Sequence, residues 1–203
     1  MRAFLDHAEG ETYNPLWLVL ACTGLRRGEV LGLTWNALDL PNVSLRVTQA
    51  VSLENGRAVI GTLKTGAAYR RVPLPEVVVA ALRSHLVAQV DIFGDRQALV
   101  FPAASGGPIN PNNLHRVFKR LIRTAGLPDI CIHELRHAYA SLLLASGQPV
   151  NLVSQVIGHA NPSTTWAFYA HTIPGQDRAL ANTISTLVDG PRVNARVNDA
   201  THR

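Results

Sequence analysis

Charge, cysteine and long apolar runs are scarce in this sequence, and each scarcity excludes a class of protein. Only 16% of the 203 residues are charged and 47% are hydrophobic, so the composition is not that of a disordered chain and provides enough apolar side chains for a core. No apolar run approaches the ~20 residues that span a membrane. The N-terminal residues lack the basic and apolar segments of a secretory signal peptide. We therefore expect a cytoplasmic protein.

The two cysteines, Cys22 and Cys131, both stand among apolar residues. We expect them to be reduced residues of the core, and to form neither a disulfide nor a metal site. Lysine is scarce as well, because Lys64 and Lys119 are the only lysines among 19 basic residues. A G+C-rich genome explains this preference for arginine as well as a functional reason does.

Positive charge exceeds negative charge in the chain. The formal net charge is +5 and the isoelectric point is about 9.8. A basic surface attracts polyanions, of which nucleic acid is the simplest example. Charge alone supports this partner only weakly.

The spacing of apolar residues predicts a mainly α-helical domain with a small three-stranded antiparallel β-sheet, an α+β fold. Strand-like alternation occurs at 43–49, 50–60 and 69–74, and Asn55-Gly56 within the second segment marks a tight hairpin. A turn at 39–42 precedes the first strand. Helical spacing occupies 15–22, 27–33, 76–90, 112–125, 133–146, 149–157 and 176–188. We expect the last residues, 191–203, to be a disordered tail.

Polar residues stand out from this apolar pattern in four places. In the first, at 23–29, Arg26 and Glu29 are three positions apart and share a helix face, so the glutamate can hold the guanidinium by hydrogen bonds. The alternative is an ordinary surface ion pair. In the second, at 63–66, Lys64 stands at a predicted turn, where most lysines are merely solvated.

The third place is a predicted helix with an unusual polar face. His133, Arg136 and His137 are at positions i, i+3 and i+4, and this set suits phosphate because an arginine can bind two oxygens at once. The opposite face, which we expect to pack inward, consists of Leu135, Tyr139 and Leu142.

The fourth place is Gly158-His159, followed ten residues later by Tyr169. Taken alone, a histidine that follows a glycine at a helix end is often only a cap. A tyrosine on a short helix is usually a core residue. Each of the four places therefore has an ordinary structural explanation when it is considered by itself.

In their order along the chain, the four places resemble the tyrosine recombinase (phage integrase) family. The matching boxes are Thr-Gly-Leu-Arg-x-Gly-Glu at 23–29, Lys-Thr-Gly at 64–66, His-x-Leu-Arg-His at 133–137, Gly-His at 158–159 and Tyr-x-His at 169–171. The resemblance implies a catalytic set made of Arg26, Lys64, His133, Arg136, His159 and Tyr169. It implies a supporting role for Glu29 and His137.

The resemblance extends over about residues 1–175 and implies a catalytic domain at 1–190 that cleaves and rejoins DNA strands. Tyr169 would attack a phosphodiester and form a 3′-phosphotyrosyl link, while Arg26 and Arg136 neutralise the phosphate.

The remaining roles implied by the resemblance concern protons. His133 would accept the proton of the tyrosine, Lys64 would protonate the leaving 5′-oxygen, and His159 would donate a hydrogen bond to the phosphate. No cofactor is implied, neither a metal ion nor ATP, because the covalent link retains the energy of the phosphodiester.

The partner implied by the resemblance is double-stranded DNA, on which the protein would act as a homo-oligomer, a tetramer, with accessory DNA-bending proteins. The predicted helix at 176–188 would dock on a neighbouring subunit. Family members usually carry an N-terminal core-binding domain, which we expect to be absent from this sequence because the boxes begin so early.

Three alternatives compete with this interpretation. His133 and His137 with the intervening glutamate match the His-Glu-x-x-His motif of zinc proteases. The extended motif requires Gly at 140 and His at 143, where this chain has Ala140 and Leu143, and an arginine on the ligand face would repel a dication. A type IB topoisomerase shares the chemistry but resembles the boxes less closely. The third alternative is a DNA-binding remnant that has lost catalysis. The complete boxes of this chain argue against it, because binding alone would not require them.

Overall fold

The computed structural model describes residues 1–11, 13–63, 66–95, 97–159 and 163, and it confirms the predicted mainly helical α+β fold. The α-helices are α1 (Arg2–His7), α2 (Asn14–Thr23), α3 (Arg27–Leu31), α4 (Glu76–Phe93), α5 (Pro111–Thr124), α6 (Ile132–Ala145) and α7 (Val150–Ile157). The strands are β1 (Leu38–Asp39), β2 (Ser44–Val47), β3 (Gln49–Glu54), β4 (Arg57–Thr62) and β5 (Arg70–Pro73). Across the described residues, no helix is long and apolar enough to cross a membrane.

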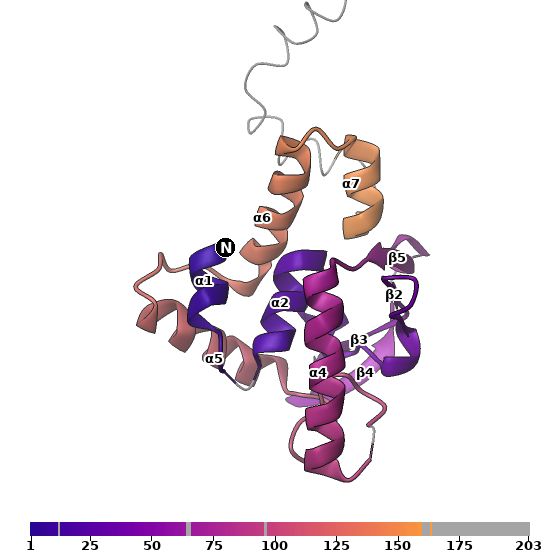
Figure 1. Ribbon diagram of the computed structural model, residues 1–203, viewed down its shortest axis with the longest axis vertical. Helices are drawn as coiled ribbons and strands as arrows, with labels where there is room; N and C mark the ends of the chain where they lie inside the picture. Colours follow the sequence, from indigo (N-terminus) through magenta and orange to yellow (C-terminus); the bar gives the residue numbers. More distant parts are fainter. Residues whose placement is uncertain (12, 64–65, 96, 160–162, 164–203) are drawn as a thin grey trace, which may run out of the picture.

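The core is organised around α2, which lies in the middle of the molecule between α1 and α5 on one side and α4 on the other (Figure 1). Its Trp17 is fully buried and packs edge-to-face on Phe4 of α1, with ring centroids 5.8 Å apart. Phe118 of α5 completes this aromatic cluster, 5.2 Å from Phe4. The continuous apolar run that predicted a buried helix is therefore buried over most of its surface, and Leu18 and Cys22 are only partly buried.

The prediction of a single sheet is wrong, because the strands form two separate sheets. One has the antiparallel order β1-β2-β5, with Leu45 opposite Val72, and it includes β1 in the segment where we expected the start of a turn. The other is the β3-β4 hairpin, which closes over Asn55 and Gly56, both with positive φ. The hairpin predicted from Asn-Gly is confirmed.

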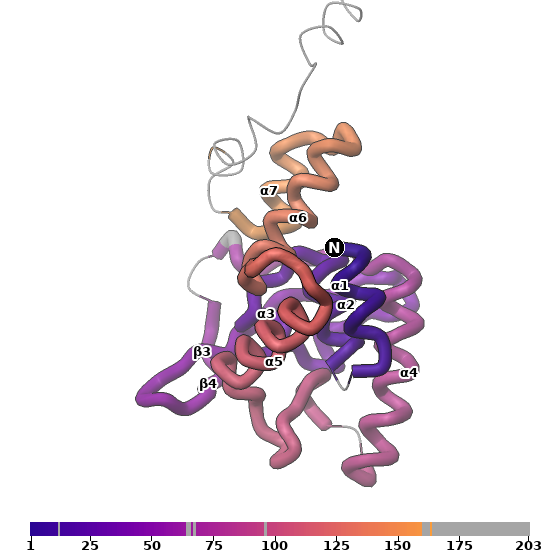
Figure 2. The backbone as a smooth tube through the Cα atoms, turned by 90° about the vertical axis from the view of Figure 1, so that its left-hand side faces the viewer, coloured from indigo at the N-terminus to yellow at the C-terminus, as the bar shows by residue number. Residues whose placement is uncertain are grey.

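The hairpin leaves the three-stranded sheet because it packs on α3 instead. A Cβ atom on Gly28 would lie only 2.5 Å from the carbonyl oxygen of Val51. The backbones of α3 and β3 therefore approach so closely that only glycine fits at position 28. The side-chain amide of Gln49 adds a hydrogen bond of 2.8 Å to the carbonyl oxygen of Gly32. As a result β3 and β4 project from the body of the molecule beside α3 (Figure 2).

The α6-α7 pair rises from the opposite end of the molecule (Figure 1). The pair has a small core of its own, made of Ala140, Leu144, Val153 and Ile157. Leu142, which we expected to pack inward, is 58% exposed. The second half of α6 extends beyond the body of the molecule, and the face of α6 that packs against α7 is not the face that carries Leu142. The last turn of α7 comes back to β5, which brings Gly158 and His159 to the body of the protein.

Both cysteines are free thiols, as expected. Cys22 packs against the core and is partly buried, and burial raises the pKa of its thiol. The expectation of a core residue is wrong for Cys131, which is exposed at the N-terminal cap of α6. The apolar residues next to Cys131 do not form a continuous buried segment. Ile132, the first residue of α6, is buried, whereas the side chain of Cys131 faces solvent.

Candidate active site

Arg26 is placed by a sharp corner between α2 and α3. Gly24 ends α2 with a φ of 63°, and a Cβ atom there would lie 2.5 Å from the ring of Tyr139, so this corner requires glycine. Arg26 follows as the N-terminal cap of α3. Its Nη2 donates a hydrogen bond of 2.9 Å to the carbonyl oxygen of Gly158, and its side chain remains 40% exposed. The guanidinium therefore still presents donors to solvent or to an anion.

Glu29 is buried between two arginines. One carboxylate oxygen accepts from the backbone N–H of Arg26 at 2.8 Å, and the other accepts from Arg26 Nη1 at 2.9 Å. Arg70 binds the same carboxylate with both of its terminal nitrogens, at 3.0 and 2.8 Å. Burial would raise the pKa of Glu29, but the hydrogen bonds and charge of Arg70, and then the hydrogen bonds from Arg26, outweigh burial and lower the pKa.

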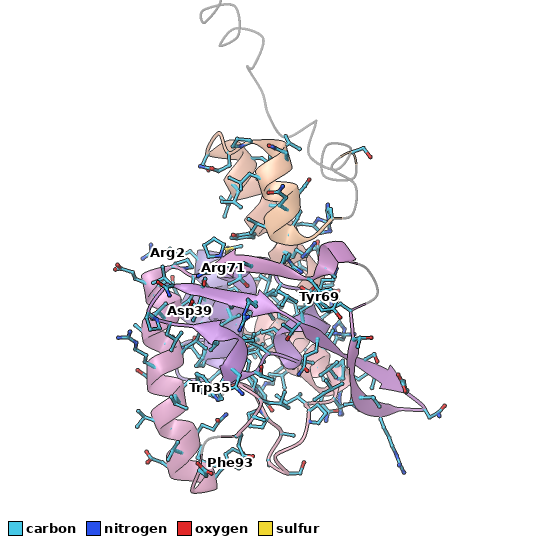
Figure 3. The ribbon with its side chains drawn as sticks, turned by 90° about the vertical axis from the view of Figure 1, so that its right-hand side faces the viewer. Arg2, Trp35, Asp39, Tyr69, Arg71 and Phe93 are labelled. Carbon is cyan, nitrogen blue, oxygen red and sulfur yellow. The ribbon has the colours of Figure 1, made fainter. Side chains whose placement is uncertain are left out.

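Arg70 was missed as a site residue in the sequence, although its strand carries a usable signal. Val72 is buried, and residues two apart on a strand share a face, so Arg70 had to point the same way. An arginine on the buried face of a strand needs an anionic partner. Arg71 points to the other face, where it binds Asp39 at 3.4 Å (Figure 3).

Helix α6 carries the second arginine and two histidines. Arg136 is buried, and its Nη1 donates a hydrogen bond of 2.6 Å to the carbonyl oxygen of Gly24, which ties α6 to the same corner that positions Arg26. The rings of His133 and His137 are edge-to-face, with centroids 4.7 Å apart. The i, i+3 and i+4 spacing thus produces one polar cluster at the start of the helix.

His159 joins this cluster electrostatically. Its pKa is lowered to about 4 by burial first, then by the positive charges of Arg136 and Arg26, and then by electrostatic repulsion from His137 and His133 in their protonated forms. Burial, followed by His137, Arg136 and Arg26, also lowers the pKa of His133. The two imidazoles are therefore neutral at pH 7, and the two guanidinium groups supply the fixed positive charge of the cluster.

Two hollows open on either side of Arg26. One, of about 430 Å³, is lined by Arg26 and His133 together with His115 of α5. The other, of about 420 Å³, lies between Arg26 and the hairpin and reaches Leu63, the residue that precedes Lys64. A phosphodiester bound at Arg26 would therefore meet α6 on one side and the end of β4 on the other.

The structure brings together six of the eight residues predicted from the sequence. These are Arg26, Glu29, His133, Arg136, His137 and His159. The other two, Lys64 and Tyr169, lie outside the described residues, as do the predicted helix at 176–188 and the predicted tail at 191–203. The described part of the site is a cationic cradle with neutral histidines beside it, an arrangement that can bind phosphate and move a proton.

The glutamate of the His-Glu-x-x-His motif has a structural role. The carboxylate of Glu134 accepts a hydrogen bond from the backbone N–H of Cys131, which caps α6. Within the described ranges, no group of three histidine, cysteine, aspartate or glutamate side chains is arranged to hold a metal ion. The glutamate of this motif is therefore engaged in the cap of α6.

The fold and the cluster define a cationic site in a mainly helical domain, and comparison with known proteins identifies its family. The phage integrase family matches residues 2–175, and the chain belongs to this family. It is 32% identical over 197 residues to a tyrosine recombinase XerC-like protein of Caldanaerobacter subterraneus subsp. tengcongensis, covering 88% of this chain and 50% of the relative. It is 29% identical over 187 residues to a putative prophage phiRv2 integrase of Mycobacterium tuberculosis, covering 91% and 49%.

Solved structures confirm the fold. The integrase of the Tn1549 transposon, in complex with transposon right end DNA, superposes with a TM-score of 0.77 at 24% identity, over 92% of this chain and 64% of that one. The XerA recombinase superposes with a TM-score of 0.67 at 25% identity, over 94% and 63%. This chain spans about half the length of the curated relatives that it matches.

Proposed function

We propose that this chain is the catalytic domain, residues 1–190, of a site-specific DNA recombinase that cleaves and rejoins strands through a 3′-phosphotyrosyl intermediate at Tyr169. The observation that carries the proposal is the convergence of Arg26 and Arg136 with His159 in a chain of the phage integrase family. These residues come from three helical segments that are far apart in the sequence. Their meeting at one place is what the transfer of a phosphoryl group requires.

The two arginines stabilise charge on the phosphate. Phosphoryl transfer places negative charge on the non-bridging oxygens, and guanidinium groups held in advance at those positions lower the barrier without a metal ion or ATP. Arg26 is held by Glu29, and Arg136 is held by the carbonyl group of Gly24. Neither arginine has to reorganise when the substrate arrives.

Each proton in the proposed reaction has a donor and an acceptor. The phenolic oxygen of Tyr169 bonds to phosphorus as the bond to the 5′-oxygen breaks, and the phenolic proton passes to His133, which is neutral at pH 7. Lys64 gives a proton to the leaving 5′-oxygen. His159 donates a hydrogen bond to the phosphate, and His137 packs on His133 and supports it. Rejoining is the same sequence in reverse.

The proposed partner is double-stranded DNA, which fits the excess of positive charge and the complexes of related folds with DNA. We infer that the protein acts as a homotetramer on DNA, with accessory DNA-bending proteins, and that the segment 176–188 docks on the neighbouring subunit. The same proposal includes a cytoplasmic location for the protein.

The proposal is tested with a negatively supercoiled plasmid that carries the DNA flanking the protein's own gene. The purified chain should relax this plasmid in the absence of ATP, because each cleavage and rejoining lets the duplex rotate. Relaxation that depends on Tyr169 supports the proposal. Binding without any relaxation would favour the alternative of a DNA-binding protein without catalysis.

A further inference from the structure

A second buried arginine, outside the predicted catalytic set, connects the parts of the site. The side chain of Arg70 on β5 is only 6% exposed. Its two terminal nitrogens bind the carboxylate of Glu29, and its Nε donates a hydrogen bond of 2.7 Å to the carbonyl oxygen of Val156. One of the terminal nitrogens also reaches the carbonyl oxygen of Ala68 at 3.1 Å. All of its nitrogens are thus used within the protein.

Arg26 repeats this arrangement from the other side of the same carboxylate. It binds Glu29 through Nη1 at 2.9 Å and the carbonyl oxygen of Gly158 through Nη2, also at 2.9 Å. The two guanidinium groups therefore flank one buried carboxylate, and each also holds a carbonyl group at the end of α7. This closed arrangement joins α3, β5 and α7.

The contact between Arg70 and Gly158 is close enough to fix the end of α7. Gly158 has a φ of 71°, and a Cβ atom there would lie 2.8 Å from Nη1 of Arg70 and 3.0 Å from its Cδ. The backbone therefore lies directly on the arginine side chain. Because His159 is the next residue, its starting position is set by this contact.

A lysine cannot replace the arginine in this role. Lysine carries one nitrogen at the end of a flexible stem, whereas the planar guanidinium spans both oxygens of Glu29 and the carbonyl oxygen of Val156 at once. A lysine at position 70 would keep the charge opposite Glu29 but would lose the contact with α7. The substitution thus separates the geometric role of Arg70 from its charge.

We propose that Arg70 is a positioning residue for strand cleavage, which sets the Arg26 guanidinium through Glu29 and sets His159 through the end of α7. The proposal rests on the function proposed above. It assigns to Arg70 no contact with the DNA, because its side chain is buried and its nitrogens are engaged with Glu29, Val156 and Ala68.

The test compares Arg70→Lys with Arg71→Lys, the matched substitution at the next residue of β5, whose side chain is 60% exposed. Covalent attachment to the plasmid that carries the DNA flanking the protein's own gene (the flanking-DNA plasmid) is measured at saturating protein. DNA affinity is measured separately by gel shift. Arg70→Lys should slow attachment at least tenfold and leave the affinity unchanged within about threefold, whereas Arg71→Lys should change neither the rate of attachment nor the affinity. Attachment by Arg70→Lys at the wild-type rate would overturn the proposal.

A double-mutant cycle tests the route through Glu29. If Arg70 acts through this carboxylate, the variant with Arg70→Lys and Glu29→Gln should attach to DNA no more slowly than the slower single variant. Rate losses that multiply would show that the two residues act independently, and would overturn the coupling.

If Arg70→Lys does not fold, as judged by circular dichroism, the double variant with Arg70→Gln and Glu29→Gln takes its place, because it replaces the two buried ions by amides. This pair should fold and attach slowly, and attachment at the wild-type rate would contradict the proposal.

A third readout does not need DNA chemistry. The NMR signal of the His159 ring in the DNA-free protein reports the position of the end of α7. The signal should shift in Arg70→Lys and stay in place in Arg71→Lys. If the wild-type chain never attaches to DNA, the proposed function fails, while this signal still decides the positioning role. An unchanged His159 signal in Arg70→Lys would overturn it.

Discussion

The Nη2 atom of Arg26 donates a hydrogen bond of 2.9 Å to the carbonyl oxygen of Gly158, a residue 132 positions later in the chain. The contact joins the N-terminal cap of α3 directly to the C-terminal cap of α7. His159 follows Gly158, so the first arginine box and the Gly-His box form one structural unit. A disturbance at either end should therefore be felt at the other.

Gly28→Ala should destabilise the protein, because the added methyl group would lie 2.5 Å from the carbonyl oxygen of Val51 and would push the hairpin away from α3. Such overpacking against backbone costs about 1–3 kcal/mol of unfolding free energy. Urea denaturation measures the loss. Gly61→Ala in β4 is the control, since nothing lies within 4 Å of a Cβ atom there. Equal stability of the two variants would show that α3 and the hairpin do not pack as described.

Arg136→Ala should slow DNA attachment by about 10²–10³-fold, the size of effect expected when a preorganised donor is lost from a phosphoryl-transfer site. Arg83→Ala on the exposed side of α4 is the control and should attach at the wild-type rate. Rates are compared at saturating protein and at a temperature where both variants are folded. A wild-type rate for Arg136→Ala would remove Arg136 from the catalytic set.

His159 should titrate near pH 4 in the free protein, because burial and then the charges of Arg136, Arg26 and the two other histidines lower its pKa. In the unfolded chain a histidine titrates at about pH 6.5, so between these two pH values the unfolded state binds more protons than the folded state. This group therefore adds stability as pH rises from about 4 to about 6.5, and its contribution is lost as pH falls through that range. NMR titration of the imidazole gives the pKa directly.

A pKa of His159 near the unfolded value would contradict the cluster described above. Urea unfolding at several pH values supplies a second measure, and His159→Asn should lose part of the pH dependence of stability. Binding of DNA brings a phosphate to the imidazole and should raise its pKa, so the titration should move upward in the complex.

Metal removal distinguishes the recombinase from the zinc protease. A chelator such as EDTA should leave DNA cleavage unchanged, because the arginines provide the charge that stabilises the phosphate. Elemental analysis of the purified protein should find no stoichiometric zinc. One zinc ion per chain, together with inactivation by the chelator, would support the protease alternative at His133 and His137.

Periodicity predicted most helices of this fold, since apolar spacing is a local property of the sequence. It predicted neither α1 nor the separation of the hairpin from the sheet. The separation depends on the close approach of Gly28 to Val51, and a one-dimensional pattern does not contain that contact. Leu142 was misplaced for the same reason, because periodicity gives the apolar face of a helix but not what covers it.

The boxes predicted which residues form the described cluster, but not how they are held. Glu29 was expected to hold Arg26, and the structure adds Arg70 as its second partner, 41 positions away. Arg70 shares the buried face of β5 with Val72, which was the available signal. A partner at that separation becomes visible only when the strand and the helix are placed together.

The central claim is that Tyr169 forms a covalent bond with DNA. The chain is incubated with the flanking-DNA plasmid, the mixture is denatured in SDS, and the protein that stays attached to DNA is digested and mapped. We predict an SDS-resistant adduct at Tyr169 that disappears in Tyr169→Phe and persists in Tyr139→Phe, whose ring packs on Gly24. An adduct that survives Tyr169→Phe, or one that maps to a different residue, would contradict it.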